Sequence, residues 1–216
     1  MTEDGSHSLF VPAINESFHS KHGAISESQH VFINAGLKKH LSKDVINIFE
    51  VGFGTGLNAF MTLLECKLSN IRINYHTVEP FPLHYSVISK LNYAESVGMP
   101  NELPLFMKLH ESPWNIDTEI TQSFYLKKMK VKLEDCLFTS DYYDLVYFDA
   151  FSPDVQPELW KSEVFNRIYV SMHQESCFVT YSAKGAVRRN LAEIGFVIER
   201  IPGPKGKREM IRASKR

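Results

Sequence analysis

A glycine-rich segment, Glu50-Val-Gly-Phe-Gly-Thr-Gly56, follows a short apolar run and precedes a helix-like pattern. Glycines at 52, 54 and 56 allow a tight turn and let the backbone approach a ligand closely beside a helix N-terminus. A dinucleotide fingerprint would have its third small residue at position 57, where this chain has Leu57. A phosphate-binding P-loop would need Gly-Lys-Ser/Thr, which the segment lacks. The segment therefore predicts a cofactor site of another class.

The E-x-G-x-G-x-G form resembles the glycine loop of S-adenosylmethionine (SAM) methyltransferases. In that class an acidic residue at the end of the second strand would accept hydrogen bonds from both ribose hydroxyls of SAM. Glu79 in Thr77-Val-Glu-Pro80 occupies this position. Glu134-Asp135 follows the third predicted strand, where the class contacts adenine. Each of these acids is also compatible with an ordinary solvated position after a strand. The residues predicted to bind SAM are Glu50, Gly52, Gly54, Gly56, Glu79 and Asp135.

A second informative segment, Tyr147-Phe-Asp-Ala-Phe-Ser-Pro-Asp154, follows a buried strand. Ligands of open α/β sheets bind at the carboxyl ends of the strands, so Asp149 should face the reactive end of the cofactor. Methyl transfer to nitrogen is an in-line displacement that needs a neutral, well-aimed amine, and positioning contributes much of its rate. We predict that Asp149 holds the amine and accepts its proton, and that Phe151 forms a wall of the acceptor site.

Strand-like and helix-like segments alternate along the chain, which predicts an α/β fold with a doubly wound, mostly parallel sheet. The last two strands are joined without a helix, so the sheet should end in an antiparallel hairpin. A boundary near residue 43 divides an N-terminal extension or lid, 1–43, from the main domain, 44–216. The predicted strands are residues 45–51, 71–78, 129–133, 143–148, 177–181, 196–200 and 209–213. The predicted helices are residues 56–68, 82–97, 158–171 and 184–194, with 100–123 irregular.

The formal net charge of -1 conceals an uneven distribution. Residues 184–216 hold ten Lys and Arg against three acids, so 14 of the 24 basic and 22 of the 25 acidic residues lie before them. A basic end on an acidic body is suited to contact a polyanion, although a solvated tail would have the same composition. The residues predicted to contact a nucleic-acid backbone are Arg188, Arg189, Lys207 and Arg208.

Membrane and metal partners are not expected. The chain starts with acidic and polar residues, and no apolar run approaches the ~18 residues of a membrane span, so we expect a cytoplasmic protein. His19 and His22 are three residues apart, but no nearby cysteine or second pair completes a metal-ligand set. We expect the N-terminal segment to act as a lid instead.

Taken together, the motifs resemble the methyltransferase part of MnmC-type bifunctional tRNA enzymes, and more closely their stand-alone, single-domain relatives. The glycine loop is common to many methyltransferases, whereas the F-D-A-F-x-P…P-x-x-W run and the G-K-R-E-M motif are more specific. The matching stretches are Asp4-Gly-Ser6, residues 19–24 and 27–32, Glu50-Val-Gly-Phe-Gly-Thr-Gly-Leu-Asn58, Val78-Glu-Pro-Phe81, Phe148-Asp-Ala-Phe-Ser-Pro153 with Pro157 and Trp160, Thr180-Tyr-Ser-Ala-Lys-Gly185, Val187-Arg-Arg189 and Gly206-Lys-Arg-Glu-Met210.

This resemblance implies a class I SAM-dependent methyltransferase fold, Rossmann-like, and methylation of the aminomethyl group on wobble uridine 34 of tRNA. The product would be 5-methylaminomethyl-2-thiouridine. The family's FAD-dependent oxidase domain has no room in 216 residues, so a separate enzyme would supply the aminomethyl intermediate. The alternative is a SAM-dependent methyltransferase of a small-molecule amine, which would share every SAM residue. A SAM-binding protein without catalysis is disfavoured by Asp149 and Phe151, and an NAD-dependent oxidoreductase by Leu57.

Overall fold

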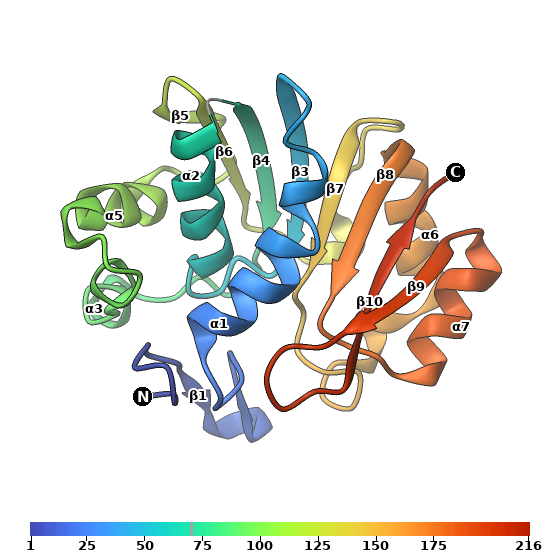
Figure 1. The fold of residues 1–216 in the computed structure, drawn as a ribbon, viewed down its shortest axis with the longest axis horizontal. Helices are drawn as coiled ribbons and strands as arrows, with labels where there is room; N and C mark the ends of the chain where they lie inside the picture. The colour runs from blue at the N-terminus through green and yellow to red at the C-terminus, as the bar shows by residue number, and fades with distance from the viewer. Residues whose placement is uncertain (70) are drawn as a thin grey trace.

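The computed structural model describes residues 1–69 and 71–216, and these form an eight-stranded sheet with the order β5-β6-β4-β3-β7-β8-β10-β9 (Figure 1). The strands from β6 to β8 pair in parallel, whereas β5 and β10 pair antiparallel to their neighbours. The strands are β3 (Val45–Val51), β4 (Arg72–Val78), β5 (Thr118–Thr121), β6 (Phe124–Met129), β7 (Tyr143–Phe148), β8 (Met172–Thr180), β9 (Val197–Pro202) and β10 (Glu209–Ser214). The predicted α/β fold with a closing antiparallel hairpin is confirmed.

Helices cover both faces of this sheet. Within the described residues, one hydrophobic cluster joins one face to α1, α2 and α5, and a second joins the other face to α6 and α7. Phe32 and Ile33 of the N-terminal segment belong to the first cluster. The helices are α1 (Ala24–Ser28), the π-helical η2 (Gln29–Asn34), α2 (Leu57–Ser69), α3 (Tyr85–Ile88), α4 (Tyr93–Ser96), α5 (Leu103–Glu111), α6 (Ser162–Ser171) and α7 (Gly185–Ile194). Among the helices of the described residues, none is both long and apolar enough to cross a bilayer.

The third parallel strand was predicted at the wrong place. β6 covers Phe124–Met129, and the chain leaves the sheet before Leu133, which begins a short 3-10 turn. The charged Lys128 occupies an inward position of β6 and is only 1% exposed. Its ammonium donates to the His110 carbonyl at 2.6 Å and lies 4.7 Å from the Trp114 ring centroid. Because a charged residue occupies this buried position, the apolar alternation that predicts a strand is interrupted in β6.

Two predicted boundaries in the middle of the chain also change. The predicted helix 82–97 is interrupted between α3 and α4. At the start of α4 the Asn92 amide accepts from the His7 backbone N–H at 2.8 Å and donates to the Gly5 carbonyl at 2.9 Å, which attaches this segment to the N-terminal segment. The segment 100–123 is more regular than predicted and contains α5 and β5. Pro104 lies in the first turn of α5, where its missing N–H leaves no helical bond unmade.

The carboxyl ends of β3, β4 and β7 lie at the same edge of the sheet, because these strands run in parallel. Two further segments meet at this edge in Figure 1. One is the N-terminal segment with the small hairpin β1 (Phe10–Val11) and β2 (Glu16–Ser17), and the other is the loop between β9 and β10. The two ends of the chain therefore cover the edge at which the predicted site residues stand.

Candidate active site

A cavity of about 910 Å³ opens at the carboxyl ends of β3, β4 and β7. It is bounded by the glycine loop, by the segments that follow β4, β6 and β7, and by the N-terminal segment. Its walls include residues 16–20, 51–55, 78–81, 132–134 and 149–152, together with Glu27, Asn58, Tyr181 and Lys207. Residues far apart in the sequence thus converge on one space.

The glycine loop lies against the cavity in a left-handed backbone conformation. Gly52, Gly54 and Gly56 have φ of 90°, 49° and 73°. A Cβ at Gly52 would approach the Asp149 carbonyl oxygen to 2.9 Å, and one at Gly56 would approach His110 Nε2 to 2.6 Å. Glycine is therefore required here by the backbone conformation and by the close packing around it.

A neutral histidine forms a hydrogen bond with the backbone of the glycine loop. His110 Nε2 donates to the Thr55 carbonyl at 3.1 Å. Burial lowers the pKa of His110 to about 3, and the charge of Lys128 adds to this shift. His110 is therefore uncharged at neutral pH and acts as a hydrogen-bond donor to the loop.

Glu79 connects the glycine loop to the end of β4. Its Oε2 accepts from the Gly54 backbone N–H at 3.1 Å, and its Oε1 accepts from the Phe81 N–H at 2.9 Å. Burial raises the pKa of Glu79, while these two hydrogen bonds oppose the shift. Each carboxylate oxygen keeps a second lone pair, so this cavity-lining group can still accept hydroxyl donors.

Glu50, Gly56 and Asp135, all predicted to bind the cofactor, do not line the cavity. The Glu50 side chain is fully buried beneath the loop, and neither of its carboxyl oxygens has a hydrogen-bond partner among the described residues. Burial raises the pKa of Glu50 to about 8, so the group is neutral at pH 7. Asp135 is exposed, whereas its neighbours Leu133 and Glu134 line the cavity.

Asp149 follows β7 directly and is oriented by a chain of hydrogen bonds. Asn58 Nδ2 donates to Asp149 Oδ2 at 2.8 Å, and Ser28 Oγ donates to Asn58 Oδ1 at 2.6 Å. Burial raises the pKa of Asp149 to about 7, and the negative charge of Glu27 adds to the rise. The carboxyl is therefore balanced between its two protonation states near neutral pH, as a group that exchanges a proton with a substrate should be.

Aromatic rings enclose the space beside Asp149. The Phe151 ring lies 5.3 Å from the Phe18 ring in an edge-on arrangement. Trp160 is buried, and its indole N–H donates to the Phe151 carbonyl at 2.9 Å. Phe18 belongs to the N-terminal segment and also lies over Gly54. Phe18 and Phe151 together line the cavity wall beside Asp149.

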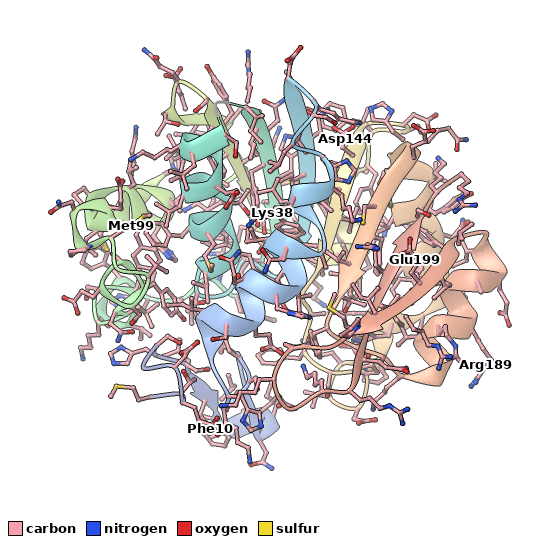
Figure 2. All side chains as sticks on the ribbon, viewed as in Figure 1. Phe10, Lys38, Met99, Asp144, Arg189 and Glu199 are labelled. Atoms are coloured by element: carbon pink, nitrogen blue, oxygen red, sulfur yellow. The ribbon has the colours of Figure 1, made fainter. Side chains whose placement is uncertain are left out.

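The predicted nucleic-acid residues fall into two groups. Arg188 and Arg189 lie on α7, and Arg189 projects from the outer side of that helix (Figure 2). Arg208 is exposed in the turn between β9 and β10, while Glu209 pairs with Arg200 at 3.5 Å. Lys207 differs, because its side chain lines the cavity and pairs with Glu27 at 2.8 Å.

Several cavity residues carry no motif that predicted their roles. Glu27 and Asn58 belong to stretches that resemble the family, but nothing in their spacing indicated contact with Asp149 or Lys207. Phe18 is one of many aromatic residues, and only its packing on the glycine loop distinguishes it. Among the described residues, no cluster of three or more His, Cys, Asp or Glu side chains is arranged to hold a metal ion.

Several curated proteins with related sequences are much longer than this chain. A protein named tRNA 5-methylaminomethyl-2-thiouridine biosynthesis bifunctional protein MnmC, from Hydrogenovibrio crunogenus, is 29% identical over 91% of this chain and 31% of its own length. A protein of the same name from Campylobacter hominis is 28% identical over 95% of this chain and 31% of its own length. The chain thus spans about a third of these relatives.

A solved structure and a family model also show similarity to methyltransferases. The crystal structure of MNMC2 from Aquifex aeolicus superimposes with a TM-score of 0.81 and 27% identity, covering 100% of this chain and 68% of the other. The sequence model of a family described as S-adenosyl-L-methionine-dependent methyltransferase matches residues 107–216, just over half of the chain. The chain belongs to this family of S-adenosyl-L-methionine-dependent methyltransferases.

Proposed function

We propose that the chain transfers a methyl group from SAM to the primary amine of the 5-aminomethyl group on uridine 34, or 2-thiouridine 34, of tRNA. The observation that carries the proposal is the cavity itself, which joins a glycine loop and Glu79 at one end to Asp149 and Phe151 at the other. The names of the relatives from Hydrogenovibrio crunogenus and Campylobacter hominis support the choice of this tRNA nucleoside as substrate.

The residues of the cavity fit SAM. Any side chain at the left-handed glycines would collide with the loop's neighbours, so glycine keeps the loop in the conformation that borders the cavity, and Glu79 has free lone pairs for the two ribose hydroxyls. When bound, SAM would supply an electrophilic methyl group on a sulfonium. On this proposal the backbone at Gly52 and Gly54 borders the cofactor, Gly56 shapes the turn, and Glu134 takes the place on the cavity wall that the sequence assigned to Asp135.

At the acceptor end, the proposed role of Asp149 is to bind the ammonium form of the substrate and to accept its proton. Asn58 and Ser28 orient the carboxyl, because the Ser28 hydroxyl engages the Asn58 oxygen and turns its N–H₂ toward Asp149. Only the ionised carboxyl can accept a proton, and its pKa is raised to about 7. The rate should therefore rise with pH through that value. Phe18 and Phe151 exclude water from the reacting amine.

The basic residues outside the cavity are the proposed contacts to the tRNA backbone. Arg188 and Arg189 would engage phosphates from α7, and Arg208 would do so from the turn between β9 and β10. Phosphate contacts of this kind make the affinity for tRNA fall with salt. The proposal also includes a separate activity that provides the aminomethyl group, in keeping with relatives that are named bifunctional.

The test compares three acceptors in the presence of SAM: tRNA carrying 5-aminomethyl-2-thiouridine at position 34, tRNA with unmodified uridine there, and a simple primary amine. The tRNA is digested to nucleosides, and their masses are measured by mass spectrometry. The proposal predicts one added methyl group on the aminomethyl nucleoside alone. Efficient methylation of the free amine with none of the tRNA would favour the small-molecule alternative.

A further inference from the structure

The acceptor end of the cavity contains a lysine that the mechanism above does not use. Lys207 lies in the turn between β9 and β10 and lines the cavity together with Asp149 and Glu27. Its ammonium is 2.8 Å from Glu27 Oε1 and 3.9 Å from the centroid of the Tyr181 ring. A positive charge therefore stands in the same enclosed space as the carboxyl that is to receive the proton of the amine.

Packing between the two ends of the chain holds this lysine in place. Gly206 has a left-handed φ of 86°, and a Cβ there would lie 2.3 Å from the His22 ring, so the turn lies directly against the N-terminal segment. His30 Nε2 donates to the Pro202 carbonyl at 2.8 Å, which attaches the end of β9 to η2. The side chain of Lys207 is about one-third exposed, far less than a freely solvated lysine.

The other partner of the ion pair is held as firmly. Glu27 lies in α1, its side chain is 11% exposed, and its Oε2 accepts from the Ser20 backbone N–H at 2.9 Å. The Tyr181 hydroxyl in turn donates to the Ala150 carbonyl at 3.0 Å, next to Asp149. Lys207 is thus held on the cavity wall by Glu27 and Tyr181.

Methyl transfer requires the neutral form of the substrate amine, whereas a primary alkylamine in water carries a proton at pH 7, as lysine does. A neighbouring positive charge disfavours a second ammonium and so promotes loss of its proton. We propose that Lys207 supplies the positive charge that drives the incoming substrate amine to give up its proton, a role that rests on the proposed function. The N–H bond of the ammonium breaks, and the proton passes to the Asp149 carboxylate. The lone pair left on nitrogen would then form the N–C bond to the methyl group while the sulfur–methyl bond of SAM breaks, its electron pair staying on sulfur in the departing thioether.

The other charged and titratable groups around the acceptor end do not supply this effect. Those facing Asp149 and Lys207 are Glu16, His19, Glu27, Glu50, Tyr75 and Tyr181. Burial lowers the pKa of His19 to about 4 and raises the pKa of Tyr75 and Tyr181 far above neutral, so these groups are uncharged. Glu50 is neutral at pH 7, and the negative charges of Glu16 and Glu27 would stabilise an ammonium rather than promote loss of its proton. Lys132, the other lysine on the described cavity wall, lies 3.8 Å from Glu134 beyond β6.

The pH dependence of methyl transfer tests this role. Single-turnover rates are measured from pH 6 to pH 10 with saturating SAM and saturating tRNA carrying 5-aminomethyl-2-thiouridine. Lys207→Met should shift the midpoint of the pH–rate profile upward by about one unit, which is roughly a tenfold lower rate on the rising limb, because the Lys207 charge favours proton loss from the substrate ammonium and also lowers the pKa of the Asp149 carboxyl. Lys207→Arg, which keeps the charge, should keep the parent midpoint. The double variant Glu27→Gln/Lys207→Met removes both charges and should move the midpoint back toward the parent.

Lys205 provides a matched control on the same turn. It pairs with Glu3 at 2.9 Å and does not line the cavity, so Lys205→Met should keep the parent profile. A parent protein that fails to methylate this tRNA would refute the proposed function itself. A parent that is active while Lys207→Met keeps the parent midpoint overturns only the role of Lys207, as does an equal loss of rate at every pH. Melting curves identify a variant that does not fold, and Lys207→Gln then takes its place.

Discussion

Replacing Glu50 by Gln is expected to remove a large, pH-dependent cost from the stability of the protein. The Glu50 carboxyl is fully buried, and its two oxygens, like the hydroxyls of Tyr75 and Thr77, have no hydrogen-bond partner among the described residues. Burial raises its pKa from the ordinary value of 4.5 to about 8 in the folded protein. The native state therefore holds a proton that the unfolded state has lost throughout this pH interval.

The sign and size of the effect follow from linkage. Because the folded protein binds more protons than the unfolded chain between pH 4.5 and 8, its free energy of unfolding falls as pH rises, by about 1.4 kcal/mol per unit from this group. Between pH 5.5 and 8 the loss is roughly 3 kcal/mol. An uncharged Gln at position 50 does not titrate, so the variant should lack this loss.

Urea unfolding of the parent and of Glu50→Gln at several pH values measures the difference directly. All other titrating groups are common to both proteins, so the stability of the variant relative to the parent should increase steadily from pH 5.5 to 8. A constant difference across that range would refute the buried, neutral state of Glu50. Calorimetry on the same proteins tests the sequence-based assignment: a large loss of SAM affinity in Glu50→Gln would show that Glu50 contributes to cofactor binding.

Three further predictions concern the two ends of the cavity and the basic surface. Glu79→Ala should weaken SAM binding by roughly 10- to 100-fold, as expected for lost charged hydrogen bonds, and unchanged affinity in calorimetry would contradict its role. Asp149→Ala and Asp149→Asn should both lower turnover by about 100-fold or more while SAM still binds, and near-normal turnover of the Asn variant would reduce Asp149 to a hydrogen-bonding group. Neutralising Arg188 and Arg189 together should weaken the salt dependence of tRNA binding. The slope of log K against log salt concentration should become less negative by about 0.7 to 0.9 per lost phosphate contact, with SAM affinity unchanged. Filter binding that gives the parent slope would contradict the α7 contact.

The sequence was sufficient for elements whose burial matches their hydrophobic pattern. Residues 45–51 were predicted as a buried parallel strand and form β3 with the same bounds. β6 was misplaced because Lys127 and Lys128 break its apolar pattern, although Lys128 is buried with its ammonium bound to a carbonyl and over an indole ring. A satisfied buried charge depends on distant partners, and no local pattern reveals it.

The same limit applies to the site. The glycine loop, Glu79 and Asp149 could be placed because each follows a predicted parallel strand, and parallel strands end at one edge. Glu27 and Lys207 could not be related to Asp149, because they reach the cavity from opposite ends of the chain through tertiary packing. A basic cluster counted along the sequence likewise gave no sign that Lys207 turns inward while Arg208 stays exposed.

The central claim is that this cavity transfers a methyl group from SAM to the wobble aminomethyl group of tRNA with the help of Asp149. The most direct test uses SAM with a trideuterated methyl group and tRNA carrying 5-aminomethyl-2-thiouridine, followed by mass spectrometry of the wobble nucleoside. The parent should place one labelled methyl on the aminomethyl nitrogen, and Asp149→Ala, which still binds SAM, should place almost none. A wobble nucleoside that gains no label from the parent, or equal label from both proteins, would contradict the account.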